Sequence, residues 1–160
     1  MQRQALRGFS LIELLTVIAI IGILATVIVV SLSAARNKGI DAATKENLNT
    51  VRNQAELRHS NLGSYGVAVA VQGTAITAAP AYNAVGSNFF ISDQQANRAL
   101  AAALADGDSG YYAIGVNGQS WAVAIATKSV TGYWCVDSQG TGKVITSTAL
   151  GGGTAAAVCP

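Results

Sequence analysis

The stretch from Arg7 to Arg36, RGFSLIELLTVIAIIGILATVIVVSLSAAR, decides how this chain is organised. No residue from Leu14 to Ala35 is charged, whereas Glu13 places a carboxylate at the start of the run. As an α-helix, the uncharged residues extend for about 33 Å, enough to cross the hydrocarbon core of a bilayer. A carboxylate in lipid costs about 2.5–3.5 kcal/mol on insertion scales, so Glu13 requires a partner.

Two simpler interpretations of the apolar run are a cleaved secretory signal and an uncleaved single-span anchor. The small residues from Ser31 to Ala35 resemble a signal-peptidase site. However, the apolar region of a secretory signal has only about 7–15 residues, and here Glu13 interrupts its beginning. The basic leader, with Arg3 and Arg7, favours a cytoplasmic N-terminus for a membrane-inserted chain.

Gly8 offers a further interpretation, because its backbone has no side chain to obstruct a protease at the membrane surface. A cut after Gly8 would give Phe9 a free α-amine, one helical turn before Glu13. That amine, on the same chain or on a neighbouring copy, is the nearby cation with which the Glu13 carboxylate can pair.

Residues Gly8 to Leu15 (GFSLIELL) closely resemble the class III signal of type IV pilins and pseudopilins. The resemblance implies that a prepilin peptidase cuts between Gly8 and Phe9, that Phe9 is N-methylated, and that Glu13 forms an intersubunit salt bridge. One departure from many relatives is that Ile28 to Ser31 lacks a proline. Whether the stem helix melts in a filament therefore stays open.

The resemblance also implies partners and locations. The expected partners are further copies of the chain in a helical filament, the prepilin peptidase, the pilus assembly platform and minor pilins. The subunit would cross the cytoplasmic membrane once, with its head outside, before it enters an extracellular filament.

The expected fold is α+β, with a long N-terminal helix packed on a small antiparallel β-sheet head, as in pilins. The predicted parts are a leader (1–8), a hydrophobic transmembrane and assembly helix (9–35), an amphipathic continuation of that helix (36–62) and an extracytoplasmic head (63–160). A C-terminal disulfide loop completes the head.

The amphipathic segment is predicted from apolar side chains that recur at spacings of three, four or seven. These are Ile40, Thr44, Leu48, Val51, Ala55 and Leu62. The other face carries two pairs of opposite charges four residues apart, Asp41/Lys45 and Arg52/Glu56. We expect a solvated helix face there, with an intersubunit bridge as the alternative.

Gly63 is predicted to end the helix. Beyond it, the segment 64–92 contains the β-prone pieces Val67–Gln72 and Asn88–Ile91 and is expected to have little regular structure. The sequence Ser92-Asp93-Gln94-Gln95 has the form of a capping box and predicts a short helix over 93–105, closed by Asp106-Gly107.

A β-meander is predicted for the rest of the head, because β-rich segments alternate with turn residues. The expected strands are Tyr111–Val116, Trp121–Thr127, Gly132–Val136 and Lys143–Ser147. Asn117-Gly118 is a strong signal for a hairpin turn between the first two. Gly151 to Gly153 precede an Ala-rich tail.

Cys135 and Cys159 are the only cysteines. In an exported domain they favour one disulfide, which would contribute roughly 3–4 kcal/mol by closing a loop. In a cytosolic protein they would instead be buried free thiols. The N-terminal segment favours export, and therefore the disulfide.

Composition argues against several other functions. The chain is 51% apolar and only 11% charged, and without Arg3 and Arg7 it has eight basic and eight acidic side chains. A chain with no net charge has no overall field that attracts nucleic acid, so nucleic acid is not indicated as a partner.

No catalytic constellation is found in the sequence, and no enzyme, cofactor or metal is predicted. His59, the only histidine, has no second histidine or nearby cysteine to form a metal site, and is expected at the surface. Asp106 to Gly110 lacks the full calcium-loop pattern and is predicted to be a turn with exposed acids.

Three structural or binding roles remain open: a subunit of a type IV pilus, a type II secretion pseudopilin, and a minor pilin that acts as an adhesin or DNA-uptake receptor. Major secretion pseudopilins typically use a calcium-stabilised end, so the two cysteines favour the pilus subunit. Lys128 and Lys143 are the candidate contacts if the head binds DNA.

Overall fold

The computed structural model describes residues 8–70, 76–83, 87–147, 149–150 and 156–160. Most of the predicted leader, residues 1–7, lies outside the described residues, as do Gly151 to Gly153. The chain divides into two compact units, Met1–Arg36 and Asn37–Pro160, which are described separately below.

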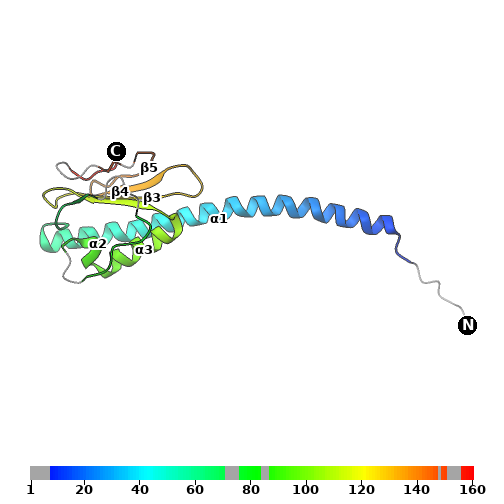
Figure 1. Cartoon of the computed structure of the whole chain (residues 1–160), viewed down its shortest axis with the longest axis horizontal. Coiled ribbons are helices and arrows are strands. Elements are labelled where there is room, and N and C mark those ends of the chain that lie inside the picture. Colours follow the sequence, from blue (N-terminus) through cyan, green and yellow to red (C-terminus); the bar gives the residue numbers. More distant parts are fainter. Residues whose placement is uncertain (1–7, 71–75, 84–86, 148, 151–155) are drawn as a thin grey trace, which may run out of the picture. The chain divides into compact units, whose positions relative to one another are not determined.

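Helix α1 (Leu11–Leu62) contributes residues to both units (Figure 1). It contains no proline, and Gly39 and Gly22 are its only glycines. The helix ends where predicted, because Gly63 adopts a φ of 69° and its N–H donates to the His59 carbonyl (2.7 Å). This left-handed termination satisfies a carbonyl in the last helical turn.

The unit from Asn37 to Pro160 contains an antiparallel sheet of five strands in sequential order. The strands are β1 (Val69–Ala70), β2 (Gly110–Ile114), β3 (Trp121–Ala126), β4 (Tyr133–Asp137) and β5 (Gly142–Ile145). The four longer strands correspond to the predicted meander. Short β1 pairs with β2, whereas Gln72, at the end of the predicted piece, lies outside the described residues.

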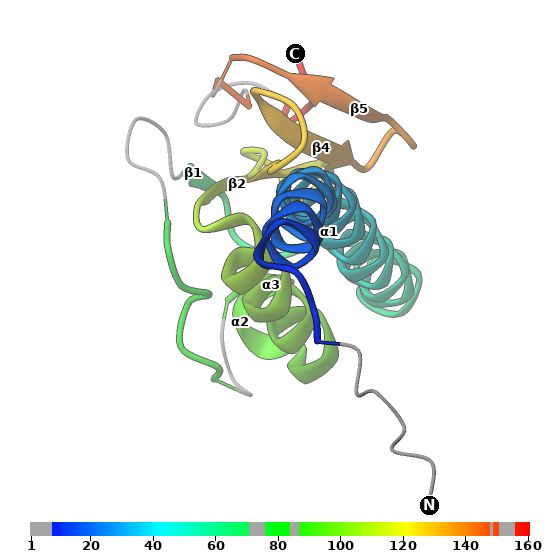
Figure 2. The ribbon, with the colours of Figure 1, turned by 90° about the vertical axis from the view of Figure 1, so that its right-hand side faces the viewer.

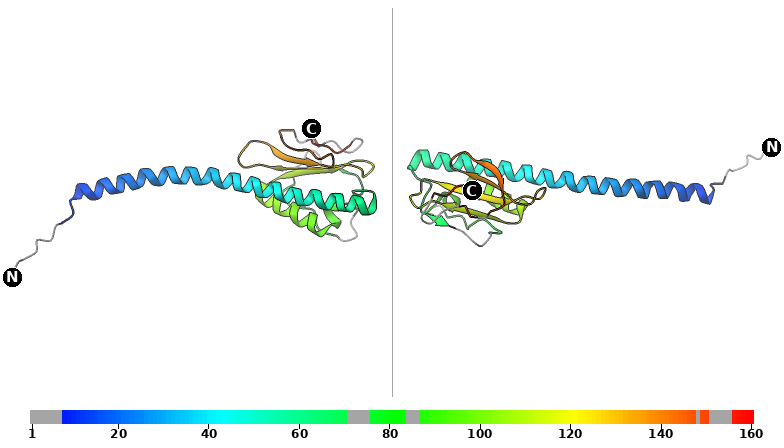
Figure 3. Two further views of the ribbon diagram at one scale, coloured as in Figure 1. Left: turned by 180° about the vertical axis from the view of Figure 1, so that it is seen from behind. Right: turned by 90° about the horizontal axis from the view of Figure 1, so that it is seen from above.

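Side chains on both faces of the sheet are buried, in the alternating pattern of extended strands. One core cluster contains Trp121, Val123 and Ile125 of β3, together with Leu48 of α1 and Leu104 of α3 (Gln94–Gly107). The residues between them, Ala122 and Ala124, join a second cluster with the C-terminal tail. The sheet therefore lies between a helical layer and the tail (Figures 2 and 3).

The helical layer includes α3 (Gln94–Gly107) beside α1. Asp93 caps α3 by accepting a hydrogen bond from the Ala96 N–H (2.8 Å). The capping signal therefore predicted the right place, but Asp93 is the cap, since the Gln95 side chain instead bonds Gln54.

The prediction of a β-prone piece at Asn88–Ile91 was wrong. Phe89–Ser92 form the one-turn helix α2. Phe89 and Phe90 are fully buried beside Trp121, with the Phe89 and Trp121 ring centroids 5.5 Å apart. Burial of two aromatic rings outweighs the local preference for strand.

The apolar stripe of α1 was largely predicted correctly, because Thr44, Leu48, Val51 and Ala55 are all fully buried. Ile40 is only half-buried, and Leu62 is 66% exposed. Leu62 lies in the last helical position, beyond the elements that cover the rest of the stripe.

The predicted solvated face of α1 was wrong at Asp41, which is 5% exposed. Its carboxylate accepts hydrogen bonds from the backbone N–H groups of Lys128 (2.7 Å) and Ser129 (3.0 Å) and from the Ser129 hydroxyl. Farther along α1, Arg52 donates to the Thr141 carbonyl.

These contacts join α1 to loops of the sheet. Glu56 likewise accepts a hydrogen bond from the Tyr65 hydroxyl (3.0 Å), and the Lys45 ammonium lies 4.2 Å from the centroid of a Trp134 ring. Charged residues of α1 thus contact other parts of the head, and the Lys45 charge also acts on Asp41, its predicted i,i+4 partner.

Candidate functional site

The candidate site is the N-terminal segment from Gly8 to Leu32, described as part of the first unit alone. Every Phe, Leu, Ile and Val from Phe9 to Leu32 is 47–88% exposed. An 18-residue window of α1 has a mean hydropathy of 2.9, and the helix is long and apolar enough to cross a membrane. In water, an apolar surface of this kind requires a covering.

Ser10 and Glu13 form a capping box at the start of α1. The Ser10 N–H donates to Glu13 Oε2 (2.9 Å), and the Ile12 N–H points to Ser10 Oγ at 3.4 Å. The Leu14 N–H donates to the Ser10 carbonyl (3.3 Å), so that the helix begins directly after Ser10. The carboxylate thus satisfies a backbone donor that the helix leaves unpaired.

Sequence analysis found Glu13 but missed this role and the contribution of Ser10. The signal was present, because Ser10-Leu11-Ile12-Glu13 has the S-x-x-E spacing of a capping box. A carboxylate held at a helix N-terminus is also favoured by the helix dipole. Glu13 therefore has a partner within its own chain before any α-amine is created.

Gly8 and Phe9 lie outside the helix. Both are exposed, Phe9 by 81%, and a Cβ added at Gly8 would have no atom within 4 Å. The Gly8–Phe9 peptide bond is therefore open to approach. The three predicted residues of the signal lie in one short segment of the chain: Gly8, Phe9 and Glu13.

The predicted disulfide is present between Cys135 and Cys159, at the opposite end of the sequence. Sequence analysis missed Asp137, which is 1% exposed beside it. One carboxylate oxygen accepts from the N–H groups of Gln139 (3.0 Å) and Thr141 (2.9 Å), and the other from Cys159 N–H (3.0 Å). Asp137 and the disulfide therefore both attach the C-terminal tail to β4.

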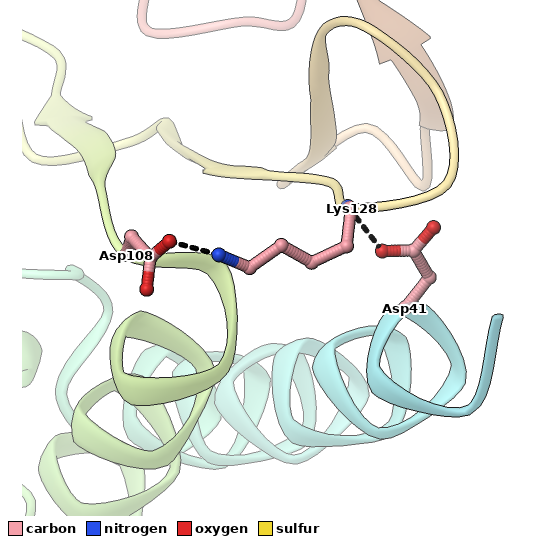
Figure 4. A network of polar contacts seen from close by, with 3 residues as sticks. All are labelled: Asp41, Asp108 and Lys128. Carbon is pink, nitrogen blue, oxygen red and sulfur yellow. Dashed lines mark hydrogen bonds and ion pairs between the residues drawn. The ribbon is translucent and has the colours of Figure 1, made fainter. Parts of the chain in front are cut away.

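A third cluster joins Asp41, Lys128 and Asp108 (Figure 4). The Lys128 ammonium pairs with the Asp108 carboxylate, and its backbone N–H points to Asp41. Lys128, one of the two residues considered for DNA contact, is therefore neutralised within the head. Among the described residues, no group of three or more His, Cys, Asp or Glu is arranged to hold a metal ion.

Burial alone would raise the pKa of Asp41, but hydrogen bonds from Ser129 and from the Lys128 backbone, with the Lys45 charge, outweigh it. The net result is a pKa of Asp41 below its usual value. Its carboxylate is therefore ionised at neutral pH and fixes the loop between β3 and β4 to α1.

Comparison with known proteins identifies the N-terminal segment. Residues 3–29 match the prokaryotic N-terminal methylation motif, a class III signal. The matched segment contains the Gly8–Phe9 bond and Glu13. No curated protein matches the chain. No solved structure matches it either.

The motif supports a type IV pilin-like or pseudopilin precursor, and it points to a structural protein rather than an enzyme. With the apolar helix, it also indicates that the chain is anchored in a membrane. The α+β architecture, with a long N-terminal helix and a small antiparallel sheet, is of the pilin kind.

Proposed function

We propose that this chain is a structural subunit of a type IV pilus. A prepilin peptidase removes residues 1–8, Phe9 is methylated, and the mature subunit polymerises through its N-terminal helix. The observation that carries the proposal is the methylation motif on the segment from Phe9 to Leu32, where every Phe, Leu, Ile and Val side chain is exposed.

The apolar surface supplies the driving force for both states of the subunit. Burying a Leu, Ile, Val or Phe side chain contributes about 1.5–3 kcal/mol, whether lipid or other helices cover it. Lipid covers the helix before assembly, and the helices of neighbouring copies cover it in the filament. Because both environments are apolar, burial alone does not select one helix offset over another.

Glu13 supplies that selection. Cleavage after Gly8 creates a cation at Phe9, and a neighbouring copy can present this amine to the Glu13 carboxylate. In an apolar surrounding, an ion pair that is broken by removal of one partner costs about 3–5 kcal/mol, so misaligned helices are rejected. The Ser10 N–H holds the carboxylate until the neighbour arrives.

The proposal is tested on material sheared from the cell surface. Electron microscopy should show long thin fibres. Mass spectrometry should show a chain that begins at a methylated Phe9 and lacks two hydrogens because of the Cys135–Cys159 disulfide. A chain that retains residues 1–8 in the fibres would contradict the maturation step.

The same measurements, made also on the periplasmic fraction, separate the alternatives. Subunits that mature at Phe9 but appear only in short periplasmic assemblies would indicate a pseudopilin of type II secretion. Fibres in which this chain is a rare component would indicate a minor pilin.

A further inference from the structure

A pocket of about 470 Å³ lies at one end of the head, in the unit from Asn37 to Pro160. Four parts of the chain form it: the end of α1 with Tyr65 just beyond it, the loop between β2 and β3, the residues that follow β4, and Ala156 of the C-terminal tail. Its side chains include His59, Asn117, Gln119, Ser120, Ser138 and Gln139. We call it the neutral pocket, because none of the described residues that line it is Asp, Glu, Lys or Arg.

An aromatic pair forms one wall of the neutral pocket. The His59 and Tyr65 rings stack with their centroids 4.6 Å apart. Tyr65 is 4% exposed, whereas His59 is half-buried and presents the more accessible ring. Burial, with the hydrogen bond to Glu56, raises the pKa of Tyr65 to about 12, so this wall carries no phenolate charge at neutral pH.

The polar side of the neutral pocket is fixed in place by the protein. Gln119 Oε1 lies 3.1 Å from His59 Nε2, and the Gln119 amide donates to the Gly63 carbonyl (2.8 Å). The Ser120 hydroxyl accepts from the Ala157 N–H (2.9 Å), and the Ser138 hydroxyl accepts from the Trp121 N–H (3.3 Å). Among the described residues neither serine hydroxyl acts as a donor, so each O–H can donate to a ligand.

The loop that bears Asn117 is also held rigidly. Gly118 has a φ of 62°, and a Cβ there would lie 2.3 Å from the Gly66 carbonyl oxygen, so glycine is required. The Gly118 carbonyl accepts from the Tyr65 N–H (2.8 Å). The exposed side chains of Asn117 and Gln139 both line this preformed cavity, which lowers the entropic cost of binding.

We propose that the neutral pocket binds a neutral saccharide of one or two sugar rings. A sugar ring has an apolar C–H face, which fits against an aromatic side chain, and a rim of hydroxyls, which fits amides and serine hydroxyls. The cavity is within the range of about 300–1,000 Å³ found for small-molecule sites. A nucleotide would bring phosphate charges that no cation in the pocket could match. The proposal does not depend on filament assembly.

The test uses the full-length chain in lipid nanodiscs and saturation-transfer NMR. The probes are glucose, galactose, N-acetylglucosamine and lactose, with cationic glucosamine and anionic sialic acid as charged comparisons. We expect transfer to at least one neutral sugar and weaker transfer to both charged ones. Absence of transfer to every neutral sugar, or equal transfer to the charged ones, overturns the proposal.

Variants then locate the binding. Combined Asn117→Ala and Gln139→Ala should weaken affinity at least about tenfold, because each lost hydrogen bond contributes roughly 1 kcal/mol. Asn53→Ala, an exposed amide of α1 outside the pocket, is the matched control and should have no effect. Sugar binding that survives the double substitution overturns the assignment to this pocket.

Substitutions of His59 test whether its ring stacks against the sugar or only supports the structure of the pocket. His59→Ala should weaken binding, whereas His59→Phe should restore much of it, because the aromatic face returns without the contact to Gln119. Equal losses in the two variants, with the near-ultraviolet circular dichroism of the head unchanged, would contradict the stacking wall.

Discussion

The two parts of helix α1 share a secondary structure but differ in what surrounds their side chains. From Leu11 to Leu32 every large apolar side chain is at least 47% exposed, whereas Leu48, Val51 and Ala55 are completely buried in the head. The first part needs an environment supplied from outside the chain, and the second part receives one from its own sheet. Because both parts are helical, the secondary structure alone does not reveal the function of α1. The function follows from what covers the apolar side chains of each part.

The largest expected effect is for substitution of Glu13, in the part of α1 whose large apolar side chains are exposed. Glu13→Ala should leave membrane insertion intact and reduce filament yield at least about tenfold, because the intersubunit ion pair is lost. Yield is measured by quantifying sheared fibres against total subunit.

Glu13→Gln is the informative companion, because glutamine retains an oxygen that can accept from the Ser10 N–H but carries no charge. Loss of fibres in both variants supports pairing of charges. Normal fibres with glutamine would instead mean that the capping box, and not the carboxylate charge, is what assembly requires.

A pair of leucines compares the two parts of α1 directly. Leu48→Ala should reduce the free energy of unfolding of the head by about 2–5 kcal/mol, because it leaves a cavity in a packed core. Leu24→Ala, at a side chain that is 56% exposed, should leave head unfolding unchanged and weaken fibres. Urea titration followed by tryptophan fluorescence, with fibre stability to heat, measures both. Equal destabilisation of the head by the two variants would refute the comparison.

A substitution at Asp137 tests which contacts attach the C-terminal tail to β4. Asp137→Asn keeps the size of the side chain but replaces one acceptor oxygen with an NH₂ group, so that at least one of its three backbone donors loses its partner. A loss of about 1–3 kcal/mol in unfolding free energy is expected. Ser147→Ala, at an exposed site near the same tail, serves as the control. An unchanged midpoint in urea for Asp137→Asn would show that the hydrogen bonds of Asp137 contribute nothing to holding the tail.

How much the sequence predicted depended on the distance between partners along the chain. The motif that contains Gly8, Phe9 and Glu13 could be recognised because its residues lie in one segment, and the capping role of Ser10 was within reach of the same reasoning. The buried stripe of α1 followed from helical spacing. Asp41 was beyond prediction, since its partners Lys128 and Ser129 lie 87 and 88 residues away in a folded loop. For Asp137 only the contact with the Cys159 N–H was beyond prediction, because the Gln139 and Thr141 N–H groups are local partners of the kind that a turn-forming aspartate binds. The prediction missed helix α2 for a related reason. Phe89 and Phe90 pack against the core, and the local sequence does not show that contact.

The smallest expected effect concerns acid and the Asp41 contact between α1 and the β3–β4 loop. The pKa of Asp41 is lowered in the folded chain, so this group stabilises the head above its unfolded pKa of about 3.9, and the contribution is lost as pH falls through the folded value. Asp41→Asn should therefore lower the unfolding free energy by roughly 1 kcal/mol at pH 7, and the difference from the parent should shrink below about pH 4. Urea titrations of both chains at pH 7, 5, 4 and 3 measure this difference. A difference that stays constant across the series would mean that ionisation of Asp41 contributes nothing to the contact between α1 and the β3–β4 loop.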